Sequence, residues 1–286
     1  MSAALERTLY TARLERKECI SESAQCYHFE FAVSSDGNNV PDFPFTAGQF
    51  VSLVANDPSG KEQTRAYSIA SANNSNRPSN IRSGNILDLC ANRTGGGFFS
   101  NYLADLAPGS TVAMHGPYGY FVLKQPITDS ILISTGTGIA PMRAFAQWLF
   151  PENGPNASLD RSEGKEIWCV YGTRHESELY YREEFEALAA KHPNFHYIPT
   201  LSRAGEEWTG LRGHVQEHVA RIIEERAAKL GQTLPLAPVD PTIRPADLTF
   251  DINAYICGLS NMITSVREKL TSYGWHRKQI IAERYD

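Results

Sequence analysis

Short segments in which apolar and polar residues alternate make up the first part of the chain, to about residue 126. The alternation is clear at 27–31, 49–54 and 111–114, and stretches rich in Gly, Pro, Asn, Asp and Ser separate such segments. Because successive side chains of a strand point to opposite faces, this pattern predicts an antiparallel β-barrel or sandwich. One helix is expected within it, at 98–106.

The pattern changes after residue 127, where apolar runs alternate with longer stretches of helical periodicity. This order predicts right-handed βαβ units and a parallel sheet. We therefore expect two domains, a β-barrel at 1–126 and an α/β domain at 127–286. The strands are expected at 131–134, 167–171, 195–199, 254–257 and 280–282, and the helices at 141–150, 178–190, 213–229 and 261–273.

Length and charge agree with this organisation and narrow the class of protein. A chain of 286 residues exceeds the usual size of a single core. Its net charge of −5 argues against a nucleic-acid-binding protein, which usually has a basic excess. No apolar run reaches the length of a membrane span, and the first residues lack the apolar core of a signal peptide. We expect a cytoplasmic location.

The cysteines and histidines give no sign of a metal centre. The five cysteines are scattered without a Cys-x-x-Cys pair, and the eight histidines form no His-x-x-x-His pair backed by acidic residues. We expect no bound metal and a reducing compartment. Any second redox centre is expected to come from another protein.

A glycine-rich turn joins a predicted strand to a predicted helix at Ser134-Thr135-Gly136-Thr137-Gly138-Ile139-Ala140-Pro141. Gly136 and Gly138 let the backbone approach a ligand closely, and the unpaired N–H groups of the following helix suit a phosphate. Pro141 fits the first turn of that helix, where a missing N–H costs nothing. The spacing departs from Gly-x-Gly-x-x-Gly, and a plain tight turn fits the segment equally well.

A second motif, Arg65-Ala66-Tyr67-Ser68, lies in a predicted strand of the first domain. Together with the glycine turn it resembles the flavin-binding Arg-x-Tyr-Ser of the ferredoxin–NADP⁺ reductase family, and the resemblance extends over nearly the whole chain. It implies that Arg65 pairs with the flavin pyrophosphate, for which a guanidinium fork is well suited. It also implies that Tyr67 packs on the isoalloxazine and that Ser68 lies near flavin N5.

Two further segments extend the resemblance in the first domain. Gly97-Phe98-Phe99-Ser100 resembles the family's Gly-x-x-Ser, which implies that Gly97 and Ser100 hold the flavin phosphate. Cys90 lies on the strand that resembles the one reading the flavin ring edge. FAD is expected rather than FMN, because FMN-using relatives generally carry a fused iron–sulfur domain. The loop at 94–96 is shorter than in the family, so the position of the adenine stays open.

The second domain resembles the family's nicotinamide-dinucleotide domain. Cys257-Gly258 resembles its Cys-Gly segment, which implies a thiol beside the nicotinamide. Glu283-Arg284-Tyr285 resembles its C-terminal Glu-x-Tyr, which implies that Tyr285 covers the flavin face and Glu283 lies on a proton route. Asp286 follows the tyrosine and departs from that pattern. The residues implied at the dinucleotide turn are Thr135, Gly136, Gly138 and Pro141.

The choice between NADPH and NADH depends on cationic partners for a 2′-phosphate. Arg174, Ser202-Arg203 and Arg212 resemble the phosphate-binding positions of NADP⁺-dependent bacterial relatives. Glu206-Glu207 is unfavourable for a phosphate, and NADH-using relatives keep a similar Trp-Gly loop. NADP(H) is favoured.

The resemblance implies an FAD-dependent ferredoxin–NADP⁺ reductase-type oxidoreductase. Nicotinamide C4 is expected against flavin N5 between the catalytic residues Ser68, Cys257 and Tyr285, with Glu283 nearby. The expected partner is a ferredoxin or flavodoxin, bound transiently, and the choice between monomer and homodimer stays open. Two alternatives also stay open. One is an NADH-dependent reductase component of an oxygenase or a free-flavin or quinone reductase, and the other is a non-catalytic flavin-bearing electron-transfer subunit.

Overall fold

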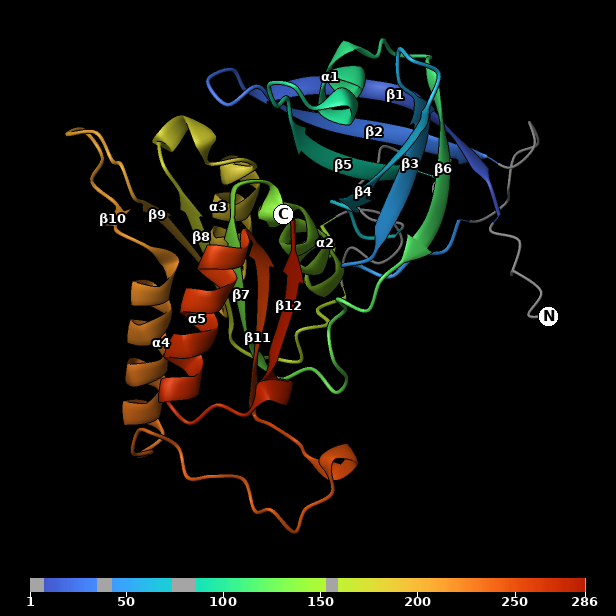
Figure 1. Cartoon of the computed structure of the whole chain (residues 1–286). Helices are drawn as coiled ribbons and strands as arrows, with labels where there is room; N and C mark the ends of the chain where they lie inside the picture. The colour runs from blue at the N-terminus through green and yellow to red at the C-terminus, as the bar shows by residue number, and fades with distance from the viewer. Residues whose placement is uncertain (1–7, 35–42, 74–85, 153–158, 286) are drawn as a thin grey trace. The chain divides into compact units, whose positions relative to one another are not determined.

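The computed structural model describes residues 8–34, 43–73, 86–152 and 159–285. It divides into two compact units (Figure 1). The first unit comprises residues up to Leu123 together with Arg143–Leu159, and the second comprises Lys124–Met142 together with Asp160–Asp286. Helix α2 (Ile139–Leu149) is shared by both units, so the domain boundary at 126 stays a prediction. None of the helices in these ranges is both long and apolar enough to cross a membrane.

A six-stranded antiparallel sheet forms the first unit, in the order β4-β3-β6-β1-β2-β5. An antiparallel bridge between Ile69 and Leu89 joins the chain after edge strand β4 to edge strand β5, so the sheet curls back on itself. This architecture confirms the predicted antiparallel β-barrel. Its elements are β1 (Tyr10–Ser21), β2 (Cys26–Ser34), β3 (Phe50–Asn56), β4 (Glu62–Ser68), β5 (Ile86–Asn92), α1 (Phe98–Asp105) and β6 (Thr111–Tyr118).

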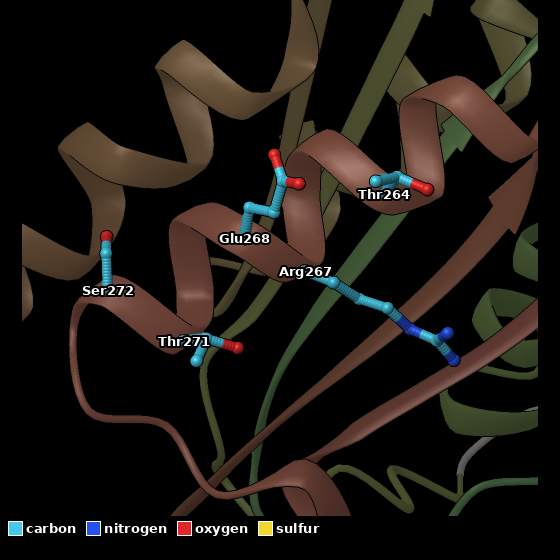
Figure 2. Close-up of a pocket in the computed structure, with 5 residues that line it drawn as sticks. All are labelled: Thr264, Arg267, Glu268, Thr271 and Ser272. Carbon is cyan, nitrogen blue, oxygen red and sulfur yellow. The ribbon is translucent and has the colours of Figure 1, made fainter.

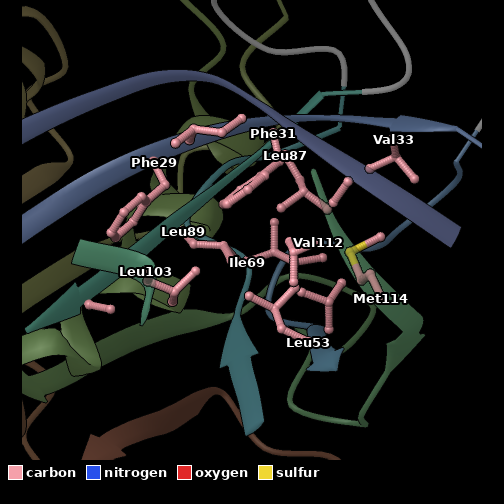
Figure 3. Close-up of a cluster of buried hydrophobic side chains, with 14 of the residues drawn as sticks. Phe29, Phe31, Val33, Leu53, Ile69, Leu87, Leu89, Leu103, Val112 and Met114 are labelled. Carbon is pink, nitrogen blue, oxygen red and sulfur yellow. The ribbon is translucent and has the colours of Figure 1, made fainter. Parts of the chain in front are cut away.

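The core of the barrel follows from the two-residue period of its strands. Phe29, Phe31 and Val33 of β2 point inward with Leu87 and Leu89 of β5 (Figure 3). The intervening residues of β2 therefore point to the opposite, outer face of the sheet. That outer face carries two buried polar side chains, His28 of β2 and Asp88 of β5.

A six-stranded parallel sheet forms the second unit, in the order β10-β9-β8-β7-β11-β12. Helices α4 and α5 cover one face, and α3 packs on the other through Phe185 against Phe195 and Tyr197 (Figure 1). This confirms the predicted α/β fold. The strands are β7 (Asp129–Thr135), β8 (Ile167–Thr173), β9 (Phe195–Leu201), β10 (Leu211–Arg212), β11 (Ile252–Gly258) and β12 (Ile280–Arg284), and the remaining helices are α3 (Arg182–Lys191), α4 (Val215–Lys229) and α5 (Ser260–Ser272).

Strand order reverses between β7 and β11. The chain builds outward from β7 through β8, β9 and β10 on one side, then returns to add β11 and β12 on the other. In open α/β sheets ligands bind beyond the carboxyl ends of the strands at such a switch point. The turn after β7 and the end of β11 are the segments that meet there.

Element boundaries differ from the expected ones mainly where local conformation interrupts helical periodicity. The helix expected at 178–190 begins at Arg182, because a 3₁₀ turn covers Glu176–Glu178 and Tyr181 has a φ of +58°. The two-residue strand β10 pairs with β9 and was not expected.

Candidate functional site

Strand β4 carries the Arg-x-Tyr-Ser residues on the edge of the barrel sheet. Arg65 is exposed, and no described residue forms an ion pair with its guanidinium. Tyr67 packs against the barrel core, and burial raises the pKa of its phenol to about 12, so it stays a neutral hydrogen-bond donor. Ser68 is buried at the end of the strand. The strand therefore carries a guanidinium and two hydroxyls at the edge of the sheet that the described residues form.

The bridge between Ile69 and Leu89 brings β4 and β5 together at this end. An antiparallel register continued by one residue sets Ser68 opposite Cys90. Two residues assigned to the flavin by resemblance, distant in sequence, are thus neighbours in the first unit.

The loop before α1 is organised by the Ser100 side chain. Its hydroxyl accepts from the Thr94 backbone N–H at 3.1 Å and lies 3.2 Å from the Gly97 carbonyl oxygen. A Cβ on Gly97 would come within 2.8 Å of the Ser100 Oγ, so a side chain there would displace the Ser100 hydroxyl from its present position. Gly97 and Ser100 are therefore in contact within one loop, and the Ser100 hydroxyl is hydrogen-bonded to the backbone of that loop.

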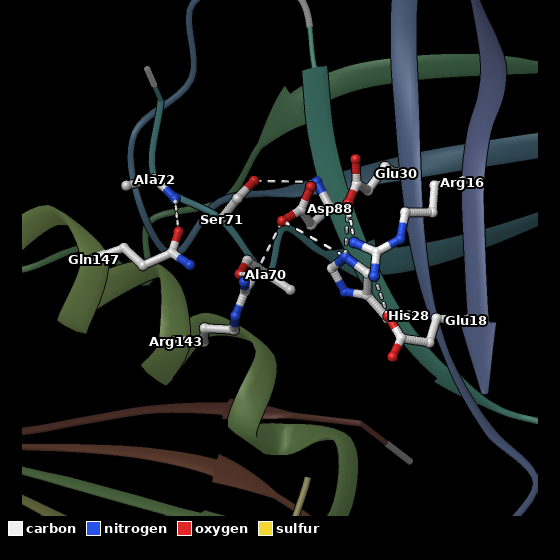
Figure 4. A network of polar contacts seen from close by, with 10 residues as sticks. All are labelled: Arg16, Glu18, His28, Glu30, Ala70, Ser71, Ala72, Asp88, Arg143 and Gln147. Carbon is white, nitrogen blue, oxygen red and sulfur yellow. Dashed lines mark hydrogen bonds and ion pairs between the residues drawn. The ribbon is translucent and has the colours of Figure 1, made fainter. Parts of the chain in front are cut away.

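Helix α2 is hydrogen-bonded to the segment 70–72, which follows the flavin-type motif of β4 (Figure 4). The sequence did not predict this contact. Within the first unit, Arg143 Nη1 donates to Asp88 Oδ2 at 2.9 Å and to the Ala70 carbonyl at 2.8 Å. One helical turn later, Gln147 Oε1 accepts from the Ala72 N–H at 3.2 Å. The spacing of four between Arg143 and Gln147 was the available signal, since it puts both on one helix face.

The dinucleotide-type turn is packed at the switch point through its glycines. A Cβ on Gly138 would come within 2.3 Å of the Cys257 carbonyl oxygen, and one on Gly258 within 2.6 Å of Thr135 Oγ1. Gly136 has a φ of +54°, and its carbonyl accepts from the Tyr171 hydroxyl at 3.0 Å. The structure thus brings this turn against the end of β11, so two motifs that are far apart in the sequence are in contact.

The C-terminal motif lies beside the same cysteine. Cys257 of β11 is the register partner of Glu283 of β12, and the Tyr285 N–H donates to the Gly258 carbonyl at 3.2 Å. Burial, with a further contribution from the Glu283 carboxylate, raises the pKa of the Cys257 thiol. The thiol is therefore neutral at physiological pH and serves as packing and weak donor rather than as a nucleophile.

Two exposed arginines lie together at the carboxyl ends of β8 and β9. The Arg203 N–H donates to the Arg174 carbonyl at 2.9 Å, and the Ser202 N–H donates to the Thr173 carbonyl at 2.9 Å. Neither the Arg174 nor the Arg203 guanidinium is hydrogen-bonded or ion-paired to a described residue. Two exposed guanidinium groups without a described partner, on residues whose backbones are hydrogen-bonded to each other, suit a phosphate group.

Arg212 differs from these two arginines. Its guanidinium donates to the carbonyls of Ala204, Gly205 and Trp208 at 3.2, 2.9 and 2.8 Å. It fixes the loop that follows Arg203 instead of presenting a free cation. Its predicted role as a direct ligand stays a prediction, and the geometry favours an indirect one.

One pocket is formed by residues of α5 that were assigned neither to the flavin nor to the dinucleotide. Figure 2 shows an open hollow along α5, lined by Thr264, Arg267, Glu268, Thr271 and Ser272. Its lining contains none of the site residues expected from the sequence. Within the described ranges, no group of three His, Cys, Asp or Glu side chains is arranged to hold a metal ion.

Comparison with known proteins matches both halves of the chain. Residues 11–123 match the oxidoreductase FAD-binding domain, and residues 132–268 match the oxidoreductase NAD-binding domain. Over 247 residues the chain is 36% identical to ferredoxin–NADP reductase B of Sorangium cellulosum, covering 85% of this chain and 86% of that protein. It is 30% identical to the phenol hydroxylase P5 protein of Acinetobacter pittii, of which it spans only 58%.

A solved structure has the same fold over its full length. The ferredoxin NADP⁺ reductase from Neisseria gonorrhoeae, determined with bound FAD and NADP, matches with a TM-score of 0.69 at 20% identity, covering 98% of this chain and 99% of that one. The flavin-type strand, the dinucleotide-type turn and the two matched domains lead to one conclusion. The chain belongs to the ferredoxin–NADP reductase family and is an FAD-dependent oxidoreductase.

Proposed function

We propose that this protein exchanges electrons between NADP(H) and a ferredoxin through its FAD. The observation that carries the choice of NADP(H) concerns Arg174 and Arg203, whose backbones are hydrogen-bonded to each other. Both side chains are exposed, and neither guanidinium is paired with a described residue. The similarity to ferredoxin–NADP reductase B of Sorangium cellulosum supports both substrates. FAD, when bound, accepts a hydride from the nicotinamide and passes its electrons on singly.

The first unit is proposed to hold the FAD. The exposed Arg65 supplies a guanidinium for the pyrophosphate, and the neutral phenol of Tyr67 supplies a ring and a donor for the isoalloxazine. Ser68 is proposed as the hydroxyl near N5, with the Cys90 backbone at the ring edge. The loop built by Gly97 and Ser100 then presents the N-terminus of α1 toward phosphate.

The second unit is proposed to hold the dinucleotide. Thr135, Gly136, Gly138 and Pro141 would receive its pyrophosphate on backbone N–H groups, and Arg174, Ser202 and Arg203 its 2′-phosphate. Arg212 is proposed to act through the loop that it fixes. Gly258 and the neutral Cys257 thiol would contact the nicotinamide, with Tyr285 covering the flavin face and Glu283 transferring protons.

An anaerobic titration of the yellow protein with NADPH and then NADH tests the proposal. Bleaching of the flavin band at low NADPH and only at high NADH is the expected result. An equal or reversed preference would favour an NADH-dependent oxygenase reductase, a class that the phenol hydroxylase relative represents. Flavin that neither nucleotide bleaches would contradict catalysis and favour a non-catalytic electron-transfer subunit.

The electron partner needs its own test. We expect the protein with NADPH to reduce a ferredoxin faster than it reduces a flavodoxin, free flavin or a quinone. The visible spectrum of the ferredoxin monitors this reduction. Faster reduction of flavodoxin would replace ferredoxin in the proposal. A cytoplasmic location forms part of the proposal, supported by five cysteines that are all free thiols.

A further inference from the structure

Two thiols face each other on the outer side of the barrel sheet. Cys26 Sγ of β2 lies 3.6 Å from Cys90 Sγ of β5, and both side chains are buried. The strands are antiparallel neighbours, with Cys26 paired to Asn92 and His28 paired to Cys90. The two cysteines are therefore diagonal neighbours on the same face. A disulfide requires the sulfurs to approach from 3.6 Å to about 2 Å. Diagonal neighbours are usually further apart than the Cα atoms of a disulfide, so the two strands must also move closer together.

A histidine accompanies this thiol pair. His28 is two residues from Cys26 on β2, hence on the same face, and it is the direct register partner of Cys90. Its Nε2 lies 3.6 Å from Glu30 Oε1 and 3.9 Å from Asp88 Oδ2 (Figure 4). The two carboxylates thus face the imidazole from its own strand and from β5. Arg16 bonds Glu30 and Arg143 bonds Asp88, so both carboxylates are held in place.

The other buried cysteines lack this arrangement. Burial raises the pKa of the Cys169 and Cys257 thiols, which keeps both protonated. The structure records one sulfur–sulfur contact among the residues it describes, that of Cys26 with Cys90. Two thiols and an imidazole could also suggest a metal site, but the described residues contain no group arranged to bind one.

We propose that Cys26 and Cys90 form a reversible disulfide when a hydroperoxide oxidises them, with His28 as the proton acceptor. The Cys90 thiol transfers its proton to His28, and the resulting thiolate attacks one oxygen of hydrogen peroxide. The O–O bond breaks, and the leaving hydroxide takes the proton back from His28 as water. Cys26 then attacks the Cys90 sulfur, the S–O bond breaks, and a second water leaves with the Cys26 proton. Two thiols lose two electrons and the peroxide gains them.

The test begins with the unaltered, FAD-loaded protein, treated with hydrogen peroxide and alkylated after unfolding. The number of free thiols is expected to fall from five to three. The mass before alkylation should fall by about 2 Da, with full reversal by dithiothreitol. Cleavage with trypsin and Glu-C should yield peptide 23–30 joined to peptide 83–93, each with one cysteine.

Variants separate this chemistry from general oxidation. Cys26→Ala and Cys90→Ala should each abolish the joined peptide, whereas Cys169→Ala, which changes an equally buried thiol, should leave its formation unchanged. His28→Gln should slow oxidation by about tenfold or more if the imidazole accepts the thiol proton. An unaltered protein that keeps five thiols, or that joins Cys90 to Cys19 instead, would overturn the disulfide. An unchanged rate in His28→Gln would overturn the role of the histidine.

Discussion

The flavin-type strand and the dinucleotide-type turn are built in opposite ways. On β4 the groups available to a ligand are side chains, of which Arg65 is exposed at a sheet edge. At the turn after β7 the proposed ligand contacts are backbone N–H groups, and there Gly138 and Gly258 pack where a side chain would not fit. Binding through side chains depends on the residues that hold the strand in place. Binding through backbone N–H groups depends on glycines, because the absence of a side chain leaves room for close packing.

The largest expected effect concerns the support of the flavin-type strand. Arg143→Met removes the cation that pairs with Asp88, whose side chain is only 8% exposed. Removing this partner from a buried carboxylate is expected to lower the free energy of unfolding by about 3 kcal/mol, measured by urea denaturation. Adding Asp88→Asn should recover most of that loss. Equal stability of the single and double variants would show that the ion pair contributes little.

The second-largest effect is expected when a side chain is added at the glycine turn after β7. Gly138→Ala forces a Cβ against the Cys257 carbonyl, and we expect a loss of about 2 kcal/mol in stability together with weaker NADP⁺ binding. Gly95→Ala, in the first unit, is the matched control, because nothing lies within 4 Å of its added Cβ and its φ is not positive. Calorimetric titration with NADP⁺ measures the binding. Normal affinity in Gly138→Ala would mean that the turn is not the binding segment.

A smaller effect is expected when the arginine pair is removed. Arg174→Ala with Arg203→Ala should weaken NADP⁺ binding by about tenfold, or about 1.4 kcal/mol, and leave NAD⁺ binding unchanged. Arg221→Ala, an exposed arginine on α4 that pairs with Glu225, serves as control. Equal weakening of both dinucleotides would place the arginines away from the 2′-phosphate.

The smallest effect at neutral pH concerns Tyr67. Burial raises the pKa of its phenol to about 12, above the value of about 10 in the unfolded chain. The unfolded state therefore loses its proton first, and stability falls as pH rises from about 10 to 12, with no contribution near pH 7. In the FAD-free protein, Tyr67→Phe should show a shallower decline of unfolding free energy over that range. An identical alkaline decline would mean that Tyr67 titrates as it does in the unfolded chain.

Much of the fold could be predicted because its signals are local. Two-residue alternation at 27–31 and the apolar strand at 131–134 each report burial of nearby positions, and both were found as strands. The start of α3 was missed because the positive φ of Tyr181 has no residue signature, unlike a glycine. Likewise, β10 is only two residues long and exists through its pairing with β9.

The candidate site also combines features with a local sequence signal and features that depend on tertiary contacts. The sequence by itself determined the family and the fold class, because those depend on residue type and spacing within one segment. The roles of the individual motif residues stay predictions. Only the tertiary structure decided that Arg212 is engaged with loop carbonyls, that Arg143 holds Asp88, and that Cys26 meets Cys90. These partners are far apart along the chain or bond to backbone atoms, so strand register and helix packing, which no local pattern encodes, bring them together.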